Sequence, residues 1–208
     1  MAYILGPKEK RSRSVGENLF LKAERSTTSK SAYLRRSYRP GMHGKKRRKI
    51  SAYGSELLEK QKVKLVYGLR ERHLERYFEQ ALSEKTSTPD ALARILESRL
   101  DSIAFRMGLA PSRSIARAIV SHGHLTVNGR RSNAPSHVLR AGDRVAIRQK
   151  STSKAFIEKI NQHLKRYEPP NWLSVDKNNL TGEILRLPSL EELQLPYNFG
   201  RIVEFYSK

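Results

Sequence analysis

Apolar residues are distributed unevenly along this chain, and their spacing predicts its elements. Residues 1–49 show little apolar periodicity, so we expect mostly extended or loosely turned backbone there. Over 53–67 and 69–83 apolar positions recur at helical spacing, which predicts two helices, the first of them capped by Ser55. A third helical stripe runs over 88–108. The first half of the chain is therefore predicted to be helical after a polar beginning.

The segment 111–131 has the most sharply defined local pattern. Ser112 can accept a hydrogen bond from a first-turn N–H and so begin a helix, which is expected to end at Gly123. A short apolar strand at 125–127 is followed by Asn128-Gly129, the dipeptide that two-residue hairpin turns prefer. Helix, short turn, helix and hairpin together resemble a helix-turn-helix with a β-hairpin added.

The remaining segments are short and mix the two periodicities. The pattern predicts a strand at 144–148, a helix at 156–167, paired strands at 172–175 and 183–187, a helical turn at 188–193 and a final strand at 201–206. Helices and antiparallel strands in one chain of 208 residues indicate an α+β protein, either one ordinary domain or two small ones.

The net charge of +21, with a pI near 10.5, implies a polyanionic partner. Nucleic acid is the first choice and an anionic membrane surface the second. Residues 1–50 carry 15 Lys or Arg against three acids, or +12, and residues 98–150 carry ten against two, or +8. Because nearly all of the charge lies in these two segments, we expect two contact surfaces on one extended polyanion.

The first basic segment contains the run from Arg35 to Lys49, RRSYRPGMHGKKRRK. One interpretation is a disordered basic tail, and the other is a segment that becomes ordered against RNA. Its dense turn-forming residues slightly favour the second. The candidate RNA-binding residues here are Arg35, Arg36, Arg39, His43, Lys45, Lys46, Arg47, Arg48 and Lys49.

The second basic segment places arginines on both the predicted helix and the hairpin. Arg113 and Arg117 lie four residues apart and share one helix face, which we expect to point outward while apolar residues pack inward. Their planar guanidinium groups, like those of Arg130 and Arg131, suit phosphate oxygens. Asp101 is expected to pair with a nearby arginine. A merely solvated basic face is the alternative interpretation.

Four smaller polar residues in the same segment are further RNA-binding candidates: Ser112, His122, His124 and Asn128. The two histidines could also ligate a metal, but no carboxylate or thiolate is close in sequence, so solvated or RNA-facing imidazoles fit better.

We find no catalytic constellation in the sequence. The chain has no cysteine, which excludes a disulfide framework, a thiolate nucleophile and a cysteine zinc site. A phosphate-cradling glycine motif and a nucleophile elbow are also absent. No run of eighteen apolar residues occurs, and residues 1–14 lack an apolar core long enough for a secretory signal. We therefore expect a soluble intracellular protein that is not an enzyme, needs no cofactor and does not contact a membrane.

Several motifs resemble the RNA-binding module named after small-subunit ribosomal protein S-four. They are Arg99-Leu100-Asp101, Ser112-Arg113, Ala116-Arg117, His122-Gly123-His124 and Val127-Asn128-Gly129. Outside the module, RPGMHGKKRRK at 39–49, SAYGSELLEKQKVKLVYG at 51–68, the pieces between 172 and 189 and the terminal IVEFYSK resemble the bacterial or organellar S-four family itself. The resemblance covers almost the whole chain.

This resemblance implies a primary rRNA-binding protein that joins early in assembly of the small subunit and organises a multi-helix junction in the 5′ domain of its rRNA. It also implies contact with ribosomal protein S-five, a position near the mRNA entry channel and an influence on decoding accuracy. The expected location is the ribosome, in the bacterial cytoplasm or an organelle interior. Lys45, Lys46, Arg47 and Arg48 match a basic run that the family places near RNA.

The family organisation implies three parts. Residues 1–49 would be a basic arm, and residues 50–97 a mainly helical domain that 187–208 completes. Residues 98–186 would be the inserted module with the strands that follow it.

One departure from the family concerns zinc. Many members hold a zinc ion with four cysteines in the N-terminal arm, and the matching positions here are Glu9, Ser12, Ser26 and Ser31. One carboxylate and three neutral hydroxyls replace four thiolates poorly, so we expect no zinc.

Two other functions use the same features. An RNA-modifying enzyme, such as a pseudouridine synthase, could use the module as a tether, but it would need a catalytic domain that the rest of the chain does not supply. A repressor or other DNA-binding protein would prefer B-form duplex, and a helix-turn-helix-like layout alone does not exclude it. The resemblance over the whole chain favours the ribosomal protein.

Overall fold

The computed structural model describes residues 6–46, 49–148 and 154–208, without the side chains of 23, 24 and 154–156. The fold is α+β, as predicted, and it comprises two compact units. Arg94–Leu193 form one unit, which contains the sheet. The second unit is helical and combines the chain up to Ala93 with Gln194–Lys208.

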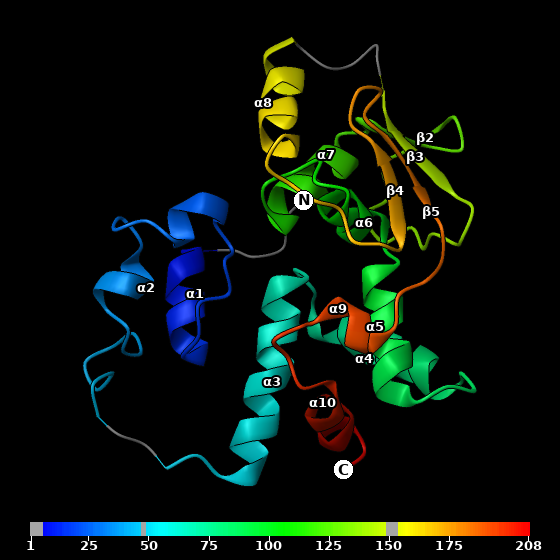
Figure 1. Ribbon diagram of the computed structural model, residues 1–208. Helices are drawn as coiled ribbons and strands as arrows, with labels where there is room; N and C mark the ends of the chain where they lie inside the picture. Colours follow the sequence, from blue (N-terminus) through cyan, green and yellow to red (C-terminus); the bar gives the residue numbers. More distant parts are fainter. Residues whose placement is uncertain (1–5, 47–48, 149–153) are drawn as a thin grey trace. The chain divides into compact units, whose positions relative to one another are not determined.

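The sheet has five antiparallel strands in the order β2-β1-β3-β5-β4 (Figure 1). The strands are β1 (Leu125–Val127), β2 (Arg130–Ser132), β3 (Arg144–Ile147), β4 (Leu173–Asp176) and β5 (Thr181–Ile184). Asn128 and Gly129 both have positive φ, of 49° and 78°, which is the geometry of the two-residue hairpin turn predicted from sequence. The predicted pairing of the two late strands is also confirmed, since Leu173 lies opposite Ile184.

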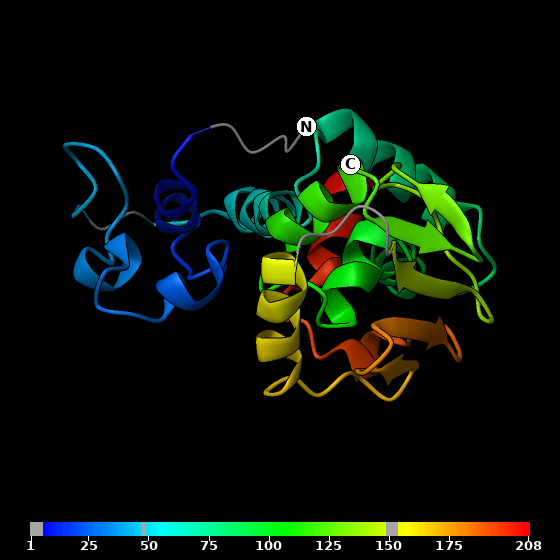
Figure 2. The same cartoon turned by 90° about the horizontal axis from the view of Figure 1, so that it is seen from above.

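Helices α6 (Leu100–Arg106) and α7 (Arg113–Ser121) lie on one face of the sheet in both views (Figures 1 and 2). Gly182 on β5 allows this close packing, because a Cβ atom there would lie 2.3 Å from the methyl group of buried Met107. Gly108 has a φ of +77° and similarly faces the ring of Tyr167, at the end of the segment that begins with α8 (Lys154–Leu164).

The long helical stripe predicted over 88–108 is interrupted, which corrects the sequence prediction. Helix α5 (Thr88–Glu97) ends at Glu97, and α6 begins at Leu100. Between them the Leu139 N–H donates to the Ser98 carbonyl at 2.8 Å, and the Leu100 N–H donates to the His137 carbonyl at 2.8 Å. Apolar spacing does not reveal such a break, because it depends on backbone bonds to a segment forty residues away.

The helical unit is centred on α3 (Ala52–Val66), α4 (Glu71–Leu82) and α10 (Phe199–Tyr206). The cap of α3 is Ser51, whose hydroxyl accepts from the Gly54 N–H, rather than the predicted Ser55. Val63, Leu74 and Phe78 are buried and form part of the core of this helical unit.

The last segment is a helix and not the strand expected over 201–206. Asn198 caps α10 by accepting from the Arg201 N–H at 3.1 Å, while its own N–H donates to Glu59 at 3.1 Å. Phe199 and Ile202, three residues apart, are buried. The cap and the 199/202 spacing therefore outweigh the strand propensity of the sequence RIVEFY.

The N-terminal segment is more helical than predicted. It contains α1 (Lys8–Val15), a 3₁₀ turn (Ala23–Ser26), α2 (Ala32–Arg35) and a left-handed Gly16 that ends α1. Lys62 of α3 contacts both Glu17 and Glu59. Short polar helices of this kind lack the periodicity that sequence analysis relies on. Helix α9 (Leu190–Leu193) confirms the predicted helical turn in the other unit.

Candidate nucleic-acid interface

Arg113 does not point outward as the sequence predicted. Its Nη2 atom donates to Glu97 Oε1 at 2.5 Å, its guanidinium carbon lies 4.9 Å from the centre of the Phe105 ring, and its side chain is only 14% exposed. Arg106 donates to the same carboxylate at 2.9 Å. Because Glu97 is fully buried, the two arginines neutralise a charge that would otherwise be costly inside the protein.

A second buried carboxylate, Asp101, accepts two bonds from Arg99, at 2.9 and 2.6 Å. Arg117 Nη1 also donates to it at 3.4 Å, and the Arg117 side chain is 18% exposed. The predicted pairing of Asp101 with an arginine is confirmed. Arg117 faces this carboxylate, so the expected outward arginine face of α7 is wrong. The arginines turn inward because Glu97 and Asp101 are four residues apart, as are Arg113 and Arg117, so each acid pairs with one of these two arginines.

Ser112 is buried and caps α7, accepting a hydrogen bond from the Ile115 N–H. This is the helix start predicted from sequence, and it makes Ser112 a structural residue in this fold. By contrast Ile115, an apolar residue of the same helix, is exposed, and Ala116, Ile119 and Val120 form the buried face.

The hairpin presents two exposed arginines. Both Arg130 and Arg131 lie on the edge strand β2 and are exposed. Arg131 donates to the His122 carbonyl at 3.4 Å, and its guanidinium covers Gly123, where a Cβ atom would lie 2.3 Å from Arg131 Nε. The rings of His122 and His124 are 6.1 Å apart. The structure thus brings Arg131, His122 and His124 close together. Arg130 precedes Arg131 on the strand, where successive side chains point to opposite faces of the sheet.

Asn128 joins two turns. Its amide donates to Asp143 Oδ1 at 2.8 Å, and its carbonyl oxygen accepts from the Arg144 N–H at 2.9 Å. The Arg140 N–H also donates to Asp143 at 2.7 Å. The Arg140 N–H and the Asn128 amide hold the pKa of Asp143 below its usual value, despite partial burial. The hairpin surface is therefore fixed in place before any ligand is present.

The basic run of the N-terminal segment forms a compact loop. Gly41 has a φ of +105°, and a Cβ atom on Gly44 would lie 1.8 Å from the Arg39 carbonyl oxygen, so both positions require glycine. The Lys46 N–H donates to the His43 carbonyl at 3.1 Å. Specific bends, predicted from the turn residues, are confirmed.

Most of the candidate residues in this loop are accessible. Arg35, Arg36, His43, Lys45, Lys46 and Lys49 are exposed and Arg39 is half-buried. Arg47 and Arg48 lie outside the described residues.

Sequence analysis overlooked Arg13. Its Nε atom donates to the Tyr38 carbonyl at 3.0 Å, and its guanidinium carbon lies 5.2 Å from the centre of the Tyr38 ring. Lys45 lies over the same ring, at 5.3 Å. The sequence did contain a signal for this arrangement. Gly16 is a typical helix end, and a helix before it places Lys10 and Arg13 one turn apart on the same face.

The four positions that the family resemblance relates to zinc ligands are inaccessible or nearly so. Ser12, Ser26 and Ser31 are buried, and Glu9 accepts from the Ala32 N–H and lies 3.6 Å from Arg25. A carboxylate already engaged in this way and three neutral hydroxyls do not fit a zinc ion. Among the residues that the structure describes, no group of three or more histidine, cysteine, aspartate or glutamate side chains could hold a metal ion.

Every helix in the described part of the chain is too short or too polar to span a membrane.

Comparison with known families divides the chain at the same place as the break between α5 and α6. Residues 4–97 match the family model described as "Ribosomal protein S4/S9 N-terminal domain", and residues 98–145 match the "S4 domain".

Three relatives that match over their full length share one name. The chain is 44% identical over 208 residues to "Small ribosomal subunit protein uS4" of Acetivibrio thermocellus, covering all of both chains. It is 44% identical over 209 residues to the protein of that name from Thermotoga maritima and 42% identical over 208 residues to that from Caldicellulosiruptor bescii, again at full coverage.

Proposed function

Because this chain belongs to the family of small ribosomal subunit protein uS4, we propose that it is a structural, non-enzymatic component of the small subunit that acts by binding rRNA. The observation that carries this proposal is the pair of exposed basic surfaces, the hairpin around Arg130 and Arg131 and the loop 35–46, both on well-defined backbone. Arginines and lysines on a well-defined backbone suit a phosphate backbone, because little loop ordering is left for binding.

The candidate residues divide into two roles. The exposed residues contact RNA directly, with arginines and lysines on phosphates and the two histidines on bases or sugars. Ser112, Arg113, Arg117 and Asn128 position this surface through the cap, the buried ion pairs and the turn contact described above. Arg47 and Arg48 join the direct group on charge alone.

At finer detail, we place the protein as a primary binder of a multi-helix junction in the 5′ domain of the small-subunit rRNA. It then lies beside ribosomal protein S-five and near the mRNA entry site, where it affects decoding accuracy. The three-part division at residues 49/50, 97/98 and 186/187 belongs to the same proposal. Family membership supports all of these, and so does the separation of the basic charge into two segments that can contact different RNA helices. The relatives named above come from bacteria, and the ribosome is the proposed location.

Competitive binding tests the proposal directly. The purified full-length protein is bound to a 5′-domain rRNA fragment at two salt concentrations, with bulk tRNA and duplex DNA as competitors. We expect the rRNA complex to survive an excess of both competitors at the higher salt, because sequence-independent phosphate contacts weaken steeply with salt while a specific fit does not. Equal competition by all three nucleic acids would contradict junction binding.

A further inference from the structure

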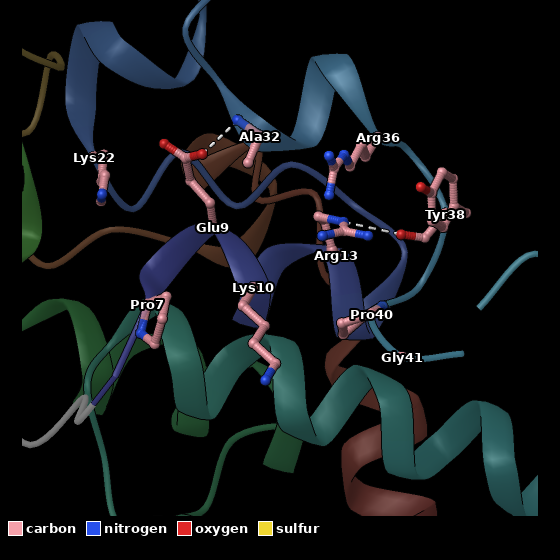
Figure 3. Close-up of a pocket in the computed structure, with 10 residues that line it drawn as sticks. All are labelled: Pro7, Glu9, Lys10, Arg13, Lys22, Ala32, Arg36, Tyr38, Pro40 and Gly41. Carbon is pink, nitrogen blue, oxygen red and sulfur yellow. Dashed lines mark hydrogen bonds between the residues drawn. The ribbon is translucent and has the colours of Figure 1, made fainter. Parts of the chain in front are cut away.

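A cavity of about 360 Å³ lies in the N-terminal segment, beside α1 and the chain from Arg36 to Gly41 (Figure 3). Four cationic side chains and one carboxylate line it: those of Lys10, Arg13, Lys22, Arg36 and Glu9. Arg36 also belongs to the exposed loop 35–46, whereas Lys10, Arg13 and Lys22 were not among the residues predicted to bind RNA.

Arg13 is held in place within the cavity wall. Its bond to the Tyr38 carbonyl uses Nε and its guanidinium lies against the Tyr38 ring. In Figure 3 the guanidinium groups of Arg13 and Arg36 point toward the same space beside Tyr38. Two such groups facing one space repel each other, so an anion between them is favoured.

The carboxylate of Glu9 does not cancel this positive charge. Its Oε2 atom accepts from the Ala32 N–H. Its Oε1 atom has no hydrogen-bond partner but lies 3.6 Å from Arg25 Nε, so the charge of Arg25 offsets that of Glu9. Burial, and then the nearby Lys22 ammonium, lower the pKa of Lys8 on α1.

We propose that this cavity binds a phosphate group through the guanidinium forks of Arg13 and Arg36, with the charge of Lys22 in support. A guanidinium can meet two phosphate oxygens at once, and Arg13 is pre-oriented to do so. The phosphate comes either from an RNA backbone, in which case the inference rests on the proposed function, or from free inorganic phosphate. Under the first source Arg13 becomes an RNA-binding residue.

The first arm of the test uses inorganic phosphate alone. The Nε–H resonances of Arg13 and Arg36 are followed by NMR in the full-length protein while phosphate is added, with sodium chloride at equal ionic strength as reference. Saturable shifts of both resonances with phosphate only are expected. Arg36→Gln should abolish them, and Lys30→Gln, an equally large loss of charge at an exposed site of the same segment outside the cavity, should not.

The second arm measures binding to the 5′-domain rRNA fragment. We expect Arg36→Gln and Arg13→Gln each to weaken binding by about tenfold, the effect of one lost charged contact. Each should also reduce the slope of log K against log salt by about 0.7 to 0.9. Lys30→Gln should change binding less than twofold. Arg36 is exposed at the end of α2, so Arg36→Gln remains informative if Arg13→Gln fails to fold.

The outcomes separate the sources. Selective loss of RNA affinity supports an RNA phosphate, and saturable shifts without that loss support a free phosphate in the same cavity. Shifts that match sodium chloride, together with RNA affinity equal to that of Lys30→Gln, would overturn the proposal. If the wild-type protein shows no preference for rRNA over the competitors, the proposed function fails, and the phosphate titration alone decides what the cavity binds.

Discussion

Glu97 lies at the point where α5, α6 and α7 are held together by charge. Its carboxylate is fully buried and contacts Arg106 and Arg113. Breaking a buried ion pair from one side costs far more than the pair contributes, because the remaining charges stay desolvated. Replacing Glu97 by Ala leaves two arginines adjacent with no carboxylate between them, so we expect the unit Arg94–Leu193 to lose about 3 kcal/mol of unfolding free energy.

Urea denaturation followed by tryptophan fluorescence measures this loss specifically. Trp172 is the single tryptophan of the chain, and it is buried in the same unit as Glu97. The control is Glu183→Ala, which breaks the exposed pair with Arg144 and should cost less than about 1 kcal/mol. Equal effects of the two substitutions would contradict the role given to Glu97.

Glu9 stands at a position where related proteins are expected to carry a zinc-binding cysteine. Here its carboxylate is engaged by the Ala32 N–H and Arg25. We expect the purified protein to contain no stoichiometric zinc by elemental analysis and to keep its Tm in EDTA, because the site offers no thiolate. Glu9→Gln should lower the unfolding free energy by about 1 kcal/mol, as a charged acceptor becomes neutral. A fall of Tm in EDTA would show that a metal is bound.

The sequence predicted one contact of the candidate site correctly and the direction of one arginine face incorrectly. The pairing of Asp101 followed from its isolation among cations, and the structure confirms it. The direction of Arg113 was wrong because helical spacing shows which residues share a face but not which face is buried. Glu97 and Asp101 are four residues apart, and so are Arg113 and Arg117. This equal spacing could have predicted the two ion pairs, whereas the apolar periodicity could not.

At the scale of elements, strong local chemistry was predictable and long-range contacts were not. The hairpin at Asn128-Gly129 and the cap at Ser112 appear as expected, because each depends on a few adjacent residues. The break at Ser98 depends on backbone bonds to residues 137–139, and α10 was mistaken for a strand because its apolar residues suit both periods.

Glu71 connects α4 to its neighbours and makes their association depend on pH. It contacts Lys60 and Lys64 of α3 at 2.7 and 2.9 Å and accepts from the Tyr206 hydroxyl of α10 at 2.8 Å. Burial raises the pKa of Glu71, but the hydrogen bonds from these three residues outweigh it and lower the pKa from 4.5 to about 2. A depressed carboxyl pKa stabilises the folded state above the unfolded value, and this stabilisation disappears as pH falls from 4.5 toward 2.

We therefore expect amide hydrogen exchange of α10 to accelerate as the pH is lowered from about 4.5 to 2, after correction for intrinsic exchange rates. In the Glu71→Gln variant, the amides of α10 should exchange faster than in the wild type at neutral pH, and their exchange should depend less on pH between 4.5 and about 2. Glu79→Gln, on the exposed side of the same helix, should behave like the wild type. If the Glu71→Gln variant showed the same pH dependence as the wild type, other carboxylates would be responsible for the effect.

At the scale of the whole molecule, nearly all of the charge of +21 lies in two segments that belong to different compact units. If both units bind the same RNA, neutralising either surface must reduce the number of released counterions. Arg130→Gln with Arg131→Gln removes two exposed cations from the hairpin, and Lys45→Gln with Lys46→Gln removes two from the loop.

Each double substitution should reduce the slope of log K against log salt by about 1.4 to 1.8, and all four together by about twice that amount. Their free-energy effects on rRNA binding should add, because the two surfaces share no residue. Filter-binding titrations of the 5′-domain fragment over a range of salt concentrations measure both quantities. A slope that falls for one pair only would confine RNA binding to that unit, and the other basic segment would then serve a different polyanion or none.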